Sequence, residues 1–269
     1  MITLVCQRWH ARRDAYRPAG EPIETHRYEV ALVPKLEAKA FVLAHHYSGS
    51  FPAARFSVGL YRKSALVGVA TLSHPASKAA LDLVLPHGGA GRTELGRFVL
   101  ADDVPSNGES WFLARVFELA RAEGFSAVCS RSDPMPRELD VDGSGKPARI
   151  FAGHVGTVYQ ASNAVYLGQS QRRTWRMYPD GTVLSDRALS KLRAKERGWE
   201  RERDLLVARG APTPRRGQAW SAWCSRARDA VSVPVRHPGT HCYVWALDRA
   251  LRRHLPTSKA YPKLGYAAP

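Results

Sequence analysis

Long apolar runs are absent from this chain of 269 residues, and none approaches the roughly 18 residues that a membrane-spanning helix needs. We therefore expect no membrane span. The first residues, MITLVCQRWHARRD, lack the basic-then-apolar order and the small-residue cleavage site of a signal peptide, so we expect a cytoplasmic protein. A hydrophobic content of 44% is sufficient for a core, and the length suits one large domain or one domain with an extension.

Cysteine is also scarce, and neither a zinc site nor a disulfide framework is expected. The four cysteines form no CxxC pair, and each lies in a different segment: Cys6, Cys129, Cys224 and Cys242. Without a CxxC pair a zinc site is not indicated, and in a cytoplasm cysteines stay reduced. We expect four reduced and mostly buried thiols.

Two nucleotide-binding motifs are missing, namely GxxxxGK[ST] and GxGxxG, so binding of a nucleoside triphosphate or a dinucleotide is not expected. The segment DDVPSNGES, residues 102–110, stands in their place before a predicted helix. Free N–H groups at a helix start can hold a phosphate or a carboxylate, and Ser106, Asn107 and Ser110 are suitable contacts. An ordinary N-cap would explain the same residues, and both interpretations stay open.

Acidic residues are few, with 24 Asp and Glu against 40 Lys and Arg, which gives a net charge of +16. The excess is uneven, because residues 1–170 carry a net charge of +3 and residues 171–269 carry +13. Nucleic acid is the expected partner of so basic a segment, since each phosphate contact releases condensed counterions. A solvated basic face is the alternative.

Hydrophobic periodicity predicts an α/β fold with a mixed, mostly antiparallel central sheet flanked by helices. In the first half, the expected strands are 3–9, 54–61, 65–72, 81–85, 94–100 and 125–130, and the expected helices are 34–46 and 110–123. In the second half, the expected helices are 153–167, 185–209, 220–230 and 248–255, and the expected strands are 172–178, 182–184 and 241–247. The order strand, helix, strand over 94–130 indicates one βαβ unit.

We expect a single domain over 1–269. Its core would span 1–180, a basic helical insertion would span 185–236, and 240–269 would complete the core with a final strand and a basic helix.

Three further segments carry candidate chemistry. Asp133, in SRSDP, follows a buried strand, where sites of α/β proteins gather, and would act as a base or a metal ligand; initiation of an Asp-Pro turn is the alternative. If 153–167 is a helix, Tyr159, Asn163 and Tyr166 share one face, with His154 in the first turn. That face would line a pocket or stack on a base, or it is a half-buried face of tyrosine hydroxyls.

The third segment is HHYSG, which ends a predicted helix just before the hairpin. Adjacent histidines cannot face the same way on a helix, so we expect only one of them to point into a site. The residue pattern by itself leaves open whether His45 or His46 points inward. A histidine there would be a general base or a metal ligand, or it would only interact favourably with the helix C-terminus.

Six motifs in this order resemble the Mom family of bacteriophage DNA-modification proteins. They are HHYSG, ELGRFVLADDVPSNGESWFLARVFELAR, SRSDP, GHVGTVYQASNAVYLG, LSKLRAKERGWE and GTHCYVWALDRALRRHLP, and the resemblance covers roughly residues 30–263. It implies a fold similar to GCN5-related N-acetyltransferases (GNAT). It also implies conversion of adenine in double-stranded DNA to N6-carbamoylmethyladenine, which protects phage DNA from host restriction. The location would then be the host cytoplasm.

The resemblance leaves the group donor open between acetyl-coenzyme A and a glycyl donor such as aminoacyl-tRNA, which would add RNA as a partner. It also implies iron as a candidate metal. Where acetyltransferases carry (Q/R)xxGx(G/A), this chain has VPSNGES. Two other functions stay open: an acyl-coenzyme A-dependent N-acetyltransferase acting on a small amine or a protein, and a non-catalytic DNA-binding protein.

An acetyltransferase-like sheet implied by the resemblance favours His46 and Tyr47 as site residues and His45 as the outward neighbour. On this basis each candidate residue receives an expected role. The catalytic set is His46, Tyr47, Asp133 and Tyr159, and the donor-binding set is Ser106, Asn107, Ser110, Asn163 and Tyr166. The DNA-binding set is Arg172, Arg173, Lys191, Arg193, Lys195 and Arg197, and the metal set is His46, Asp133 and His154. Asp133 or His46 would accept the proton of adenine N6, and base flipping would bring that atom to an aromatic pocket.

Overall fold

The computed structural model describes residues 5–7, 16–18, 22–75, 91–105, 107–139, 148–151 and 153–263. The expected strand 81–85 and the donor-binding candidate Ser106 lie outside these residues. In the described part, no helix is both long and apolar enough to cross a membrane.

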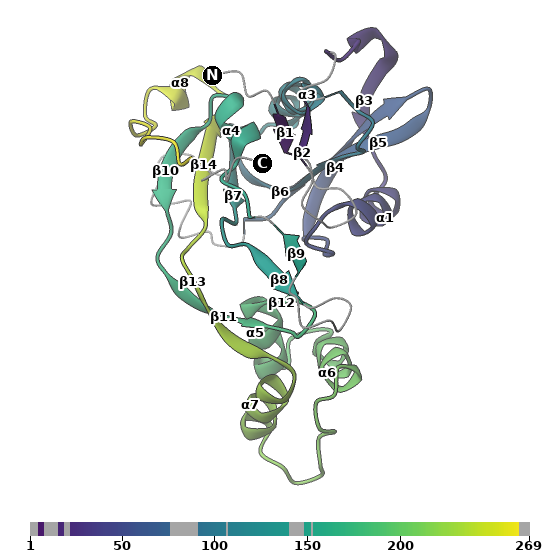
Figure 1. The fold of residues 1–269 in the computed structure, drawn as a ribbon, viewed down its shortest axis with the longest axis vertical. Helices are drawn as coiled ribbons and strands as arrows, with labels where there is room; N and C mark the ends of the chain where they lie inside the picture. Colours follow the sequence, from purple (N-terminus) through teal and green to yellow (C-terminus); the bar gives the residue numbers. More distant parts are fainter. Residues whose placement is uncertain are drawn as a thin grey trace. The chain divides into compact units, whose positions relative to one another are not determined.

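The chain forms two compact units (Figure 1). Unit 1 comprises Met1–Pro136, Arg149–Ser170 and Thr240–Pro269, and unit 2 comprises Arg137–Ala148 and Gln171–Gly239. The expected basic insertion 185–236 lies inside unit 2, which also includes the strands before and after that segment.

Unit 1 is built on a seven-stranded sheet in the order β10-β14-β7-β6-β5-β4-β3. Every neighbouring pair is antiparallel except β6 and β7, which are parallel. The strands are β3 (Tyr28–Leu32), β4 (Ala54–Arg62), β5 (Ala65–Ser73), β6 (Arg92–Leu100), β7 (Ala127–Ser132), β10 (Val165–Gln169) and β14 (His241–Ala246). The predicted fold class, an α/β protein with a mixed and mostly antiparallel sheet, is confirmed.

The helices and remaining short elements of unit 1 include helices predicted at 34–46, 110–123 and 248–255, whereas no element was predicted at 16–18, at 25–27 or at β3. They are α1 (Lys35–His45), α3 (Gly108–Ala122), α4 (Thr157–Ala161), α8 (Arg249–Arg252), the 3-10 helix η1 (Thr25–Arg27) and the strand pair β1 (Val5–Gln7) and β2 (Tyr16–Pro18). The predicted βαβ unit is confirmed as β6, α3 and β7. The β4–β5 hairpin turns through Lys63 and Ser64, both with positive φ, at 48° and 66°, as a tight two-residue turn requires.

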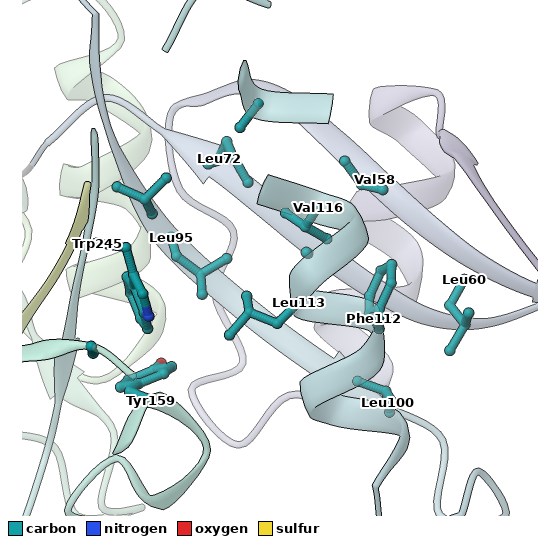
Figure 2. Close-up of a cluster of buried hydrophobic side chains, with 14 of the residues drawn as sticks. Val58, Leu60, Leu72, Leu95, Leu100, Phe112, Leu113, Val116, Tyr159 and Trp245 are labelled. Carbon is teal, nitrogen blue, oxygen red and sulfur yellow. The ribbon is translucent and has the colours of Figure 1, made fainter. Parts of the chain in front are cut away.

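Helices cover both faces of this sheet because alternate strand residues point to opposite sides. On β5, Ala70 and Leu72 pack in the core under α3, whereas Val69 packs under α1. Figure 2 shows the first of these cores, in which Phe112, Leu113 and Val116 of α3 lie against side chains of the strands, and Tyr159 and Trp245 lie beside them. α8 packs through Leu251 on the same face as α1, against Val244.

Unit 2 has its own core. A three-stranded sheet in the order β12-β11-β13 accompanies the helices α5, α6 and α7. The bounds are β11 (Arg173–Met177), β12 (Val183–Leu184), β13 (Val233–His237), α5 (Asp186–Ala194), α6 (Trp199–Ala208) and α7 (Trp220–Val231); β8 (Arg137–Leu139) and β9 (Ala148–Phe151) are short strands near the unit boundary in sequence. Leucines of α5 and α6 pack on Trp223 and Cys224 of α7. The hairpin predicted at 172–184 is confirmed, whereas β13 was not predicted.

Two helix predictions are wrong. The helix predicted over 185–209 is interrupted, because Lys195 and Gly198 adopt left-handed conformations with φ of 49° and 77°, which separate α5 from α6. The helix predicted over 153–167 is only the single turn of α4. Gly156 and Asn163 bound it with φ of 75° and 57°, and the chain then continues as β10.

Candidate functional site

The sheet of unit 1 divides between its two parallel strands. β6 and β7 pair only over Arg92–Glu94 and Ala127–Cys129, after which β6 continues beside β5 and β7 continues beside β14. A buried side chain links the two strands beyond this point, since Ser130 Oγ donates to the Leu95 carbonyl oxygen at 3.1 Å. The carboxyl ends of parallel strands are where sites of α/β sheets form.

The HHYSG segment is a turn that follows α1. His46 N–H donates to the Val42 carbonyl at 2.9 Å and ends the helix, and Gly49 N–H donates to the His46 carbonyl at 3.0 Å, with Gly49 at a φ of 55°. The turn buries His46, which is 7% exposed, and leaves His45 exposed against Phe41. The pKa of His46 lies well below its ordinary value because of burial, with the Arg97 and His154 charges adding to the shift. His46 is therefore neutral at neutral pH.

Tyr47 connects this turn to the segment before α4. Its ring stacks on His46 at a centroid distance of 4.3 Å and on Phe151 at 4.5 Å. Its hydroxyl lies 3.1 Å from His154 Nε2, in a hydrogen bond whose direction depends on the imidazole tautomer. Two residues that the sequence separates by 107 positions thus form a phenol–imidazole pair.

Tyr159 is the next ring of this aromatic group. Its centroid lies 6.5 Å from that of His154, and it meets Tyr243 and Trp245 edge-on at 5.4 Å each. Figure 2 shows Tyr159 beside Trp245, at the margin of the α3 core. Burial raises the pKa of the Tyr159 phenol, opposed by a hydrogen bond with Ser130 and by the Arg97 charge. The phenol therefore remains protonated and can serve as a hydrogen-bond donor.

Asp133 lies just beyond β7 and is buried, with 8% exposure. Its Oδ1 accepts the Met135 N–H at 2.9 Å, which is the turn geometry typical of an Asp-Pro pair, and its carbonyl oxygen accepts the His154 N–H at 2.7 Å. Asp133 thus fixes the backbone at His154, and the structure brings four candidates into one aromatic and polar group: His46, Tyr47, Asp133 and His154.

Arg97 of β6 is a site residue that we did not predict. Its Nε donates to the Ser50 carbonyl at 2.8 Å, and its Nη2 donates to Ser50 Oγ at 2.7 Å. Burial lowers the pKa of Arg97, while Tyr47 and Glu94 favour the charged form. A charged residue inside the apolar strand ELGRFVL was a usable signal, because such a residue is rarely buried without a partner. Phe151 lies in a polar stretch that gave no such signal.

The donor-binding candidates do not gather in one place. Asn107 is the N-cap residue of α3, but its Oδ1 accepts the Ile23 N–H at 2.7 Å rather than a helix N–H. Ser110 Oγ donates to the Asn107 carbonyl at 3.1 Å, so both side chains make structural contacts within the protein. Asn163 is exposed, whereas Tyr166 is buried on β10 with its hydroxyl 2.7 Å from His241 Nδ1. The expected shared face of Tyr159, Asn163 and Tyr166 is wrong, because these residues lie on a helix, a turn and a strand.

Some of the basic candidates of unit 2 contact acidic or aromatic side chains, and others are exposed. Lys191 Nζ pairs with Glu202 Oε1 at 3.3 Å, and Lys195 Nζ lies 4.8 Å from the centroid of the Trp220 ring. Arg173 lies over Trp175, at 5.2 Å. The side chains of Arg172, Arg193 and Arg197 are exposed.

The described residues do not assemble the expected metal set. Among them, no group of three or more His, Cys, Asp or Glu side chains is arranged to hold a metal ion. His46 Nδ1 already accepts the Ser48 N–H at 3.1 Å, and Asp133 Oδ1 accepts a backbone N–H. His46, Asp133 and His154 are therefore not assembled as an iron site among the described residues, and no chemical step below involves a metal.

Comparison with solved structures finds acetyltransferases. A tandem GNAT protein from the clavulanic acid biosynthesis pathway is 11% identical, with a TM-score of 0.42, over 82% of this chain and 99% of that chain. An N-acetyltransferase from Staphylococcus aureus Mu50 is 10% identical, with a TM-score of 0.35, over 82% and 99%. N-acetylglutamate synthase from Neisseria gonorrhoeae, solved with coenzyme A and N-acetyl-glutamate, is 11% identical, with a TM-score of 0.34, over 87% and 37%.

A family model gives the more specific result. Residues 27–140 match the model of the Mom protein family. The match confirms the resemblance seen in the sequence over that segment, which contains His46, Tyr47, Arg97 and Asp133. No curated protein matched the sequence.

Proposed function

We propose that this protein is a DNA-modifying transferase that converts adenine in double-stranded DNA to N6-carbamoylmethyladenine and so protects phage DNA from restriction in the host cytoplasm. The observation that carries the proposal is the group formed by His46, Tyr47, Asp133 and His154 beside the divided sheet. Three of these residues lie inside the segment that matches the Mom family model. The basic charge of residues 171–269 supports DNA as the substrate.

The chemistry requires a proton acceptor, because the adenine N6 lone pair is delocalised into the ring and nucleophilic attack releases a proton. Asp133, His46 and the Tyr47–His154 pair are the groups available for this role. A neutral imidazole and a buried carboxylate are suitable general bases. The flipped adenine would be held by hydrogen bonds and aromatic contacts, for which Tyr47 and Tyr159 are the nearest phenols.

The group donor is proposed to be a glycyl donor such as aminoacyl-tRNA, because the acetyl group of acetyl-coenzyme A lacks the nitrogen of a carbamoylmethyl group. Acetyl-coenzyme A would be the donor of the alternative function, an N-acetyltransferase. A carbamoylmethyl group has the same atoms as a glycyl group, so transfer of a glycyl group followed by rearrangement accounts for the product. A glycyl donor of this kind adds RNA as a partner.

The test is expression in a bacterial host followed by nucleoside analysis. Total DNA is digested to nucleosides, and mass spectrometry is used to look for deoxyadenosine carrying a carbamoylmethyl group. The matched control is Glu118→Gln, which changes only an exposed ion pair with Arg115 on α3 and should leave modification intact. Unmodified adenine in the presence of folded protein contradicts the proposal. Acetylation of an added amine with acetyl-coenzyme A would instead support an N-acetyltransferase.

DNA binding is tested on unit 2 by a pair of matched variants. Arg193→Gln with Arg197→Gln removes two exposed charges, so affinity should fall and the slope of log affinity against log salt should decrease by about 2. Arg187→Gln is the control, because Arg187 is already paired with Glu196. An unchanged salt slope in the double variant would remove this helical region from the DNA interface.

A further inference from the structure

The backbone N–H of Ser48 favours one tautomer of His46. This N–H donates to His46 Nδ1 at 3.1 Å. A backbone amide can only donate, so Nδ1 must present a lone pair. The Ser48 hydroxyl lies 2.9 Å from the same nitrogen. In a neutral imidazole with an unprotonated Nδ1, the proton is on Nε2.

A chain of hydrogen bonds from Arg97 favours the same tautomer of His46. A guanidinium has no acceptor, so Ser50 Oγ accepts from Arg97 Nη2 at 2.7 Å and its own proton is free to donate. Ser50 Oγ donates to Ser48 Oγ at 3.4 Å, which leaves the Ser48 proton for His46 Nδ1, whose one lone pair is then shared between the hydroxyl and the N–H of Ser48. The competing acceptor of the Ser48 hydroxyl is the Ser50 carbonyl at 3.5 Å, a longer contact that also accepts from Arg97 Nε. The shorter bond to His46 prevails.

The other ring nitrogen of His46, Nε2, is not engaged in the same way as Nδ1. Within the described residues, His46 Nε2 has no hydrogen-bond partner, although the side chain is 7% exposed and stacks on Tyr47. A neutral imidazole with its proton on Nε2 donates a hydrogen bond and cannot accept the proton of an attacking amine at that nitrogen. A neutral histidine used in this way polarises a carbonyl oxygen, as in triosephosphate isomerase.

We propose that His46 is a neutral hydrogen-bond donor to the carbonyl oxygen of an acyl donor, with Ser48, Ser50 and Arg97 as positioning residues that hold its proton on Nε2. This inference rests on the proposed function and narrows it in two respects. The donor presents an ester or thioester carbonyl, and the proton acceptor is a group other than His46.

The acyl-transfer step then balances as follows. Adenine N6 forms a bond to the carbonyl carbon, and the carbonyl electron pair moves to oxygen, where Nε2–H stabilises the negative charge. Return of that pair expels the alkoxide or thiolate of the donor, which takes up a proton. The N6 proton passes to Asp133 or to the Tyr47–His154 pair.

The first test is independent of activity. The full-length protein is labelled with ¹⁵N-histidine, and the ring nitrogen shifts of His46 are read at neutral pH, assigned by their loss in His46→Gln. An unprotonated Nδ1 with a protonated Nε2 is the expected result. A proton on Nδ1, or on both nitrogens, overturns the inference. This result stands even if wild-type protein modifies no adenine, in which case the function fails and the tautomer is still decided.

The second test uses DNA modification. The side-chain amide of glutamine places an N–H near the position of Nε2–H but is not a base. His46→Gln should therefore stay within about tenfold of wild type, whereas His46→Ala should lose about 100-fold, the usual effect of removing one such donor. Equal losses in both variants, or full activity in His46→Ala, overturn the inference when wild-type protein is active.

The positioning residues are tested through Ser50. Ser50→Ala interrupts the chain between Arg97 and Ser48, so the Nδ1-protonated tautomer should increase and kcat should fall with little change in KM. Ser50→Thr restores the hydroxyl and should restore both. An unchanged tautomer ratio in Ser50→Ala would show that Arg97 takes no part in fixing the proton.

Discussion

Substitutions of Tyr47 separate the contribution of its hydroxyl from that of its ring. Tyr47→Phe keeps the ring stacked on His46 and Phe151 and removes the hydroxyl that is hydrogen-bonded to His154. A single hydrogen bond contributes about 1 kcal/mol, and each aromatic pair contributes about 0.5–1.5 kcal/mol. We therefore expect Tyr47→Phe to destabilise unit 1 by about 1 kcal/mol and Tyr47→Ala by about 2–4 kcal/mol.

Native-state hydrogen exchange of peptides from β7 is the appropriate assay, because it reports on unit 1 alone in a chain with two separate cores. The same variants are then assayed for DNA modification. If Tyr47 and His154 carry the N6 proton, Tyr47→Phe should lower modification by about tenfold or more despite its small effect on stability. Full activity in Tyr47→Phe would exclude the hydroxyl from proton transfer. Equal destabilisation by the two variants would refute the assignment of most of the stabilisation to ring stacking.

Three further predictions concern stability. Gly156→Ala should prevent normal packing before α4, because φ is +75° and a Cβ would lie 2.8 Å from the Tyr243 ring. The expected result is loss of soluble protein or a sharp fall in Tm. Ser185→Ala removes the side-chain cap of α5 and should cost about 0.5–2 kcal/mol in unit 2, measured by hydrogen exchange of α5 peptides, with the exposed Ser221→Ala as the neutral control. The lowered pKa of His46 predicts a pH dependence of stability. Near pH 6.5 the unfolded chain takes up a proton at His46 and the folded chain does not, so the free energy of unfolding should fall as the pH drops below about 6.5. Urea titrations measure this, and the same pH dependence in His46→Gln as in wild type would contradict it.

The periodic apolar segments were sufficient to predict most of the fold. The helix 110–123 and the strands 94–100 and 125–130 were predicted from local pattern, because each buries a continuous stripe or an unbroken apolar run. The helix predicted over 153–167 was wrong because its tyrosines suggested a helical face, whereas a glycine and an asparagine with positive φ bound a single turn and Tyr166 pairs in a strand. β13 was missed because a strand of VPVRH has too little apolar pattern to be distinguished from a loop.

For the site, the chain by itself determined which residue types were available and where turns must form. HHYSG predicted the end of a helix, SRSDP predicted a turn, and the family motifs indicated where to look for chemistry. The tertiary structure alone decided which side chains meet. It pairs Tyr47 with His154, and it joins Arg97 to His46 through Ser50 and Ser48. The physical reason is that a proton position depends on hydrogen bonds made across strands and turns, and no periodicity in the sequence encodes those distances.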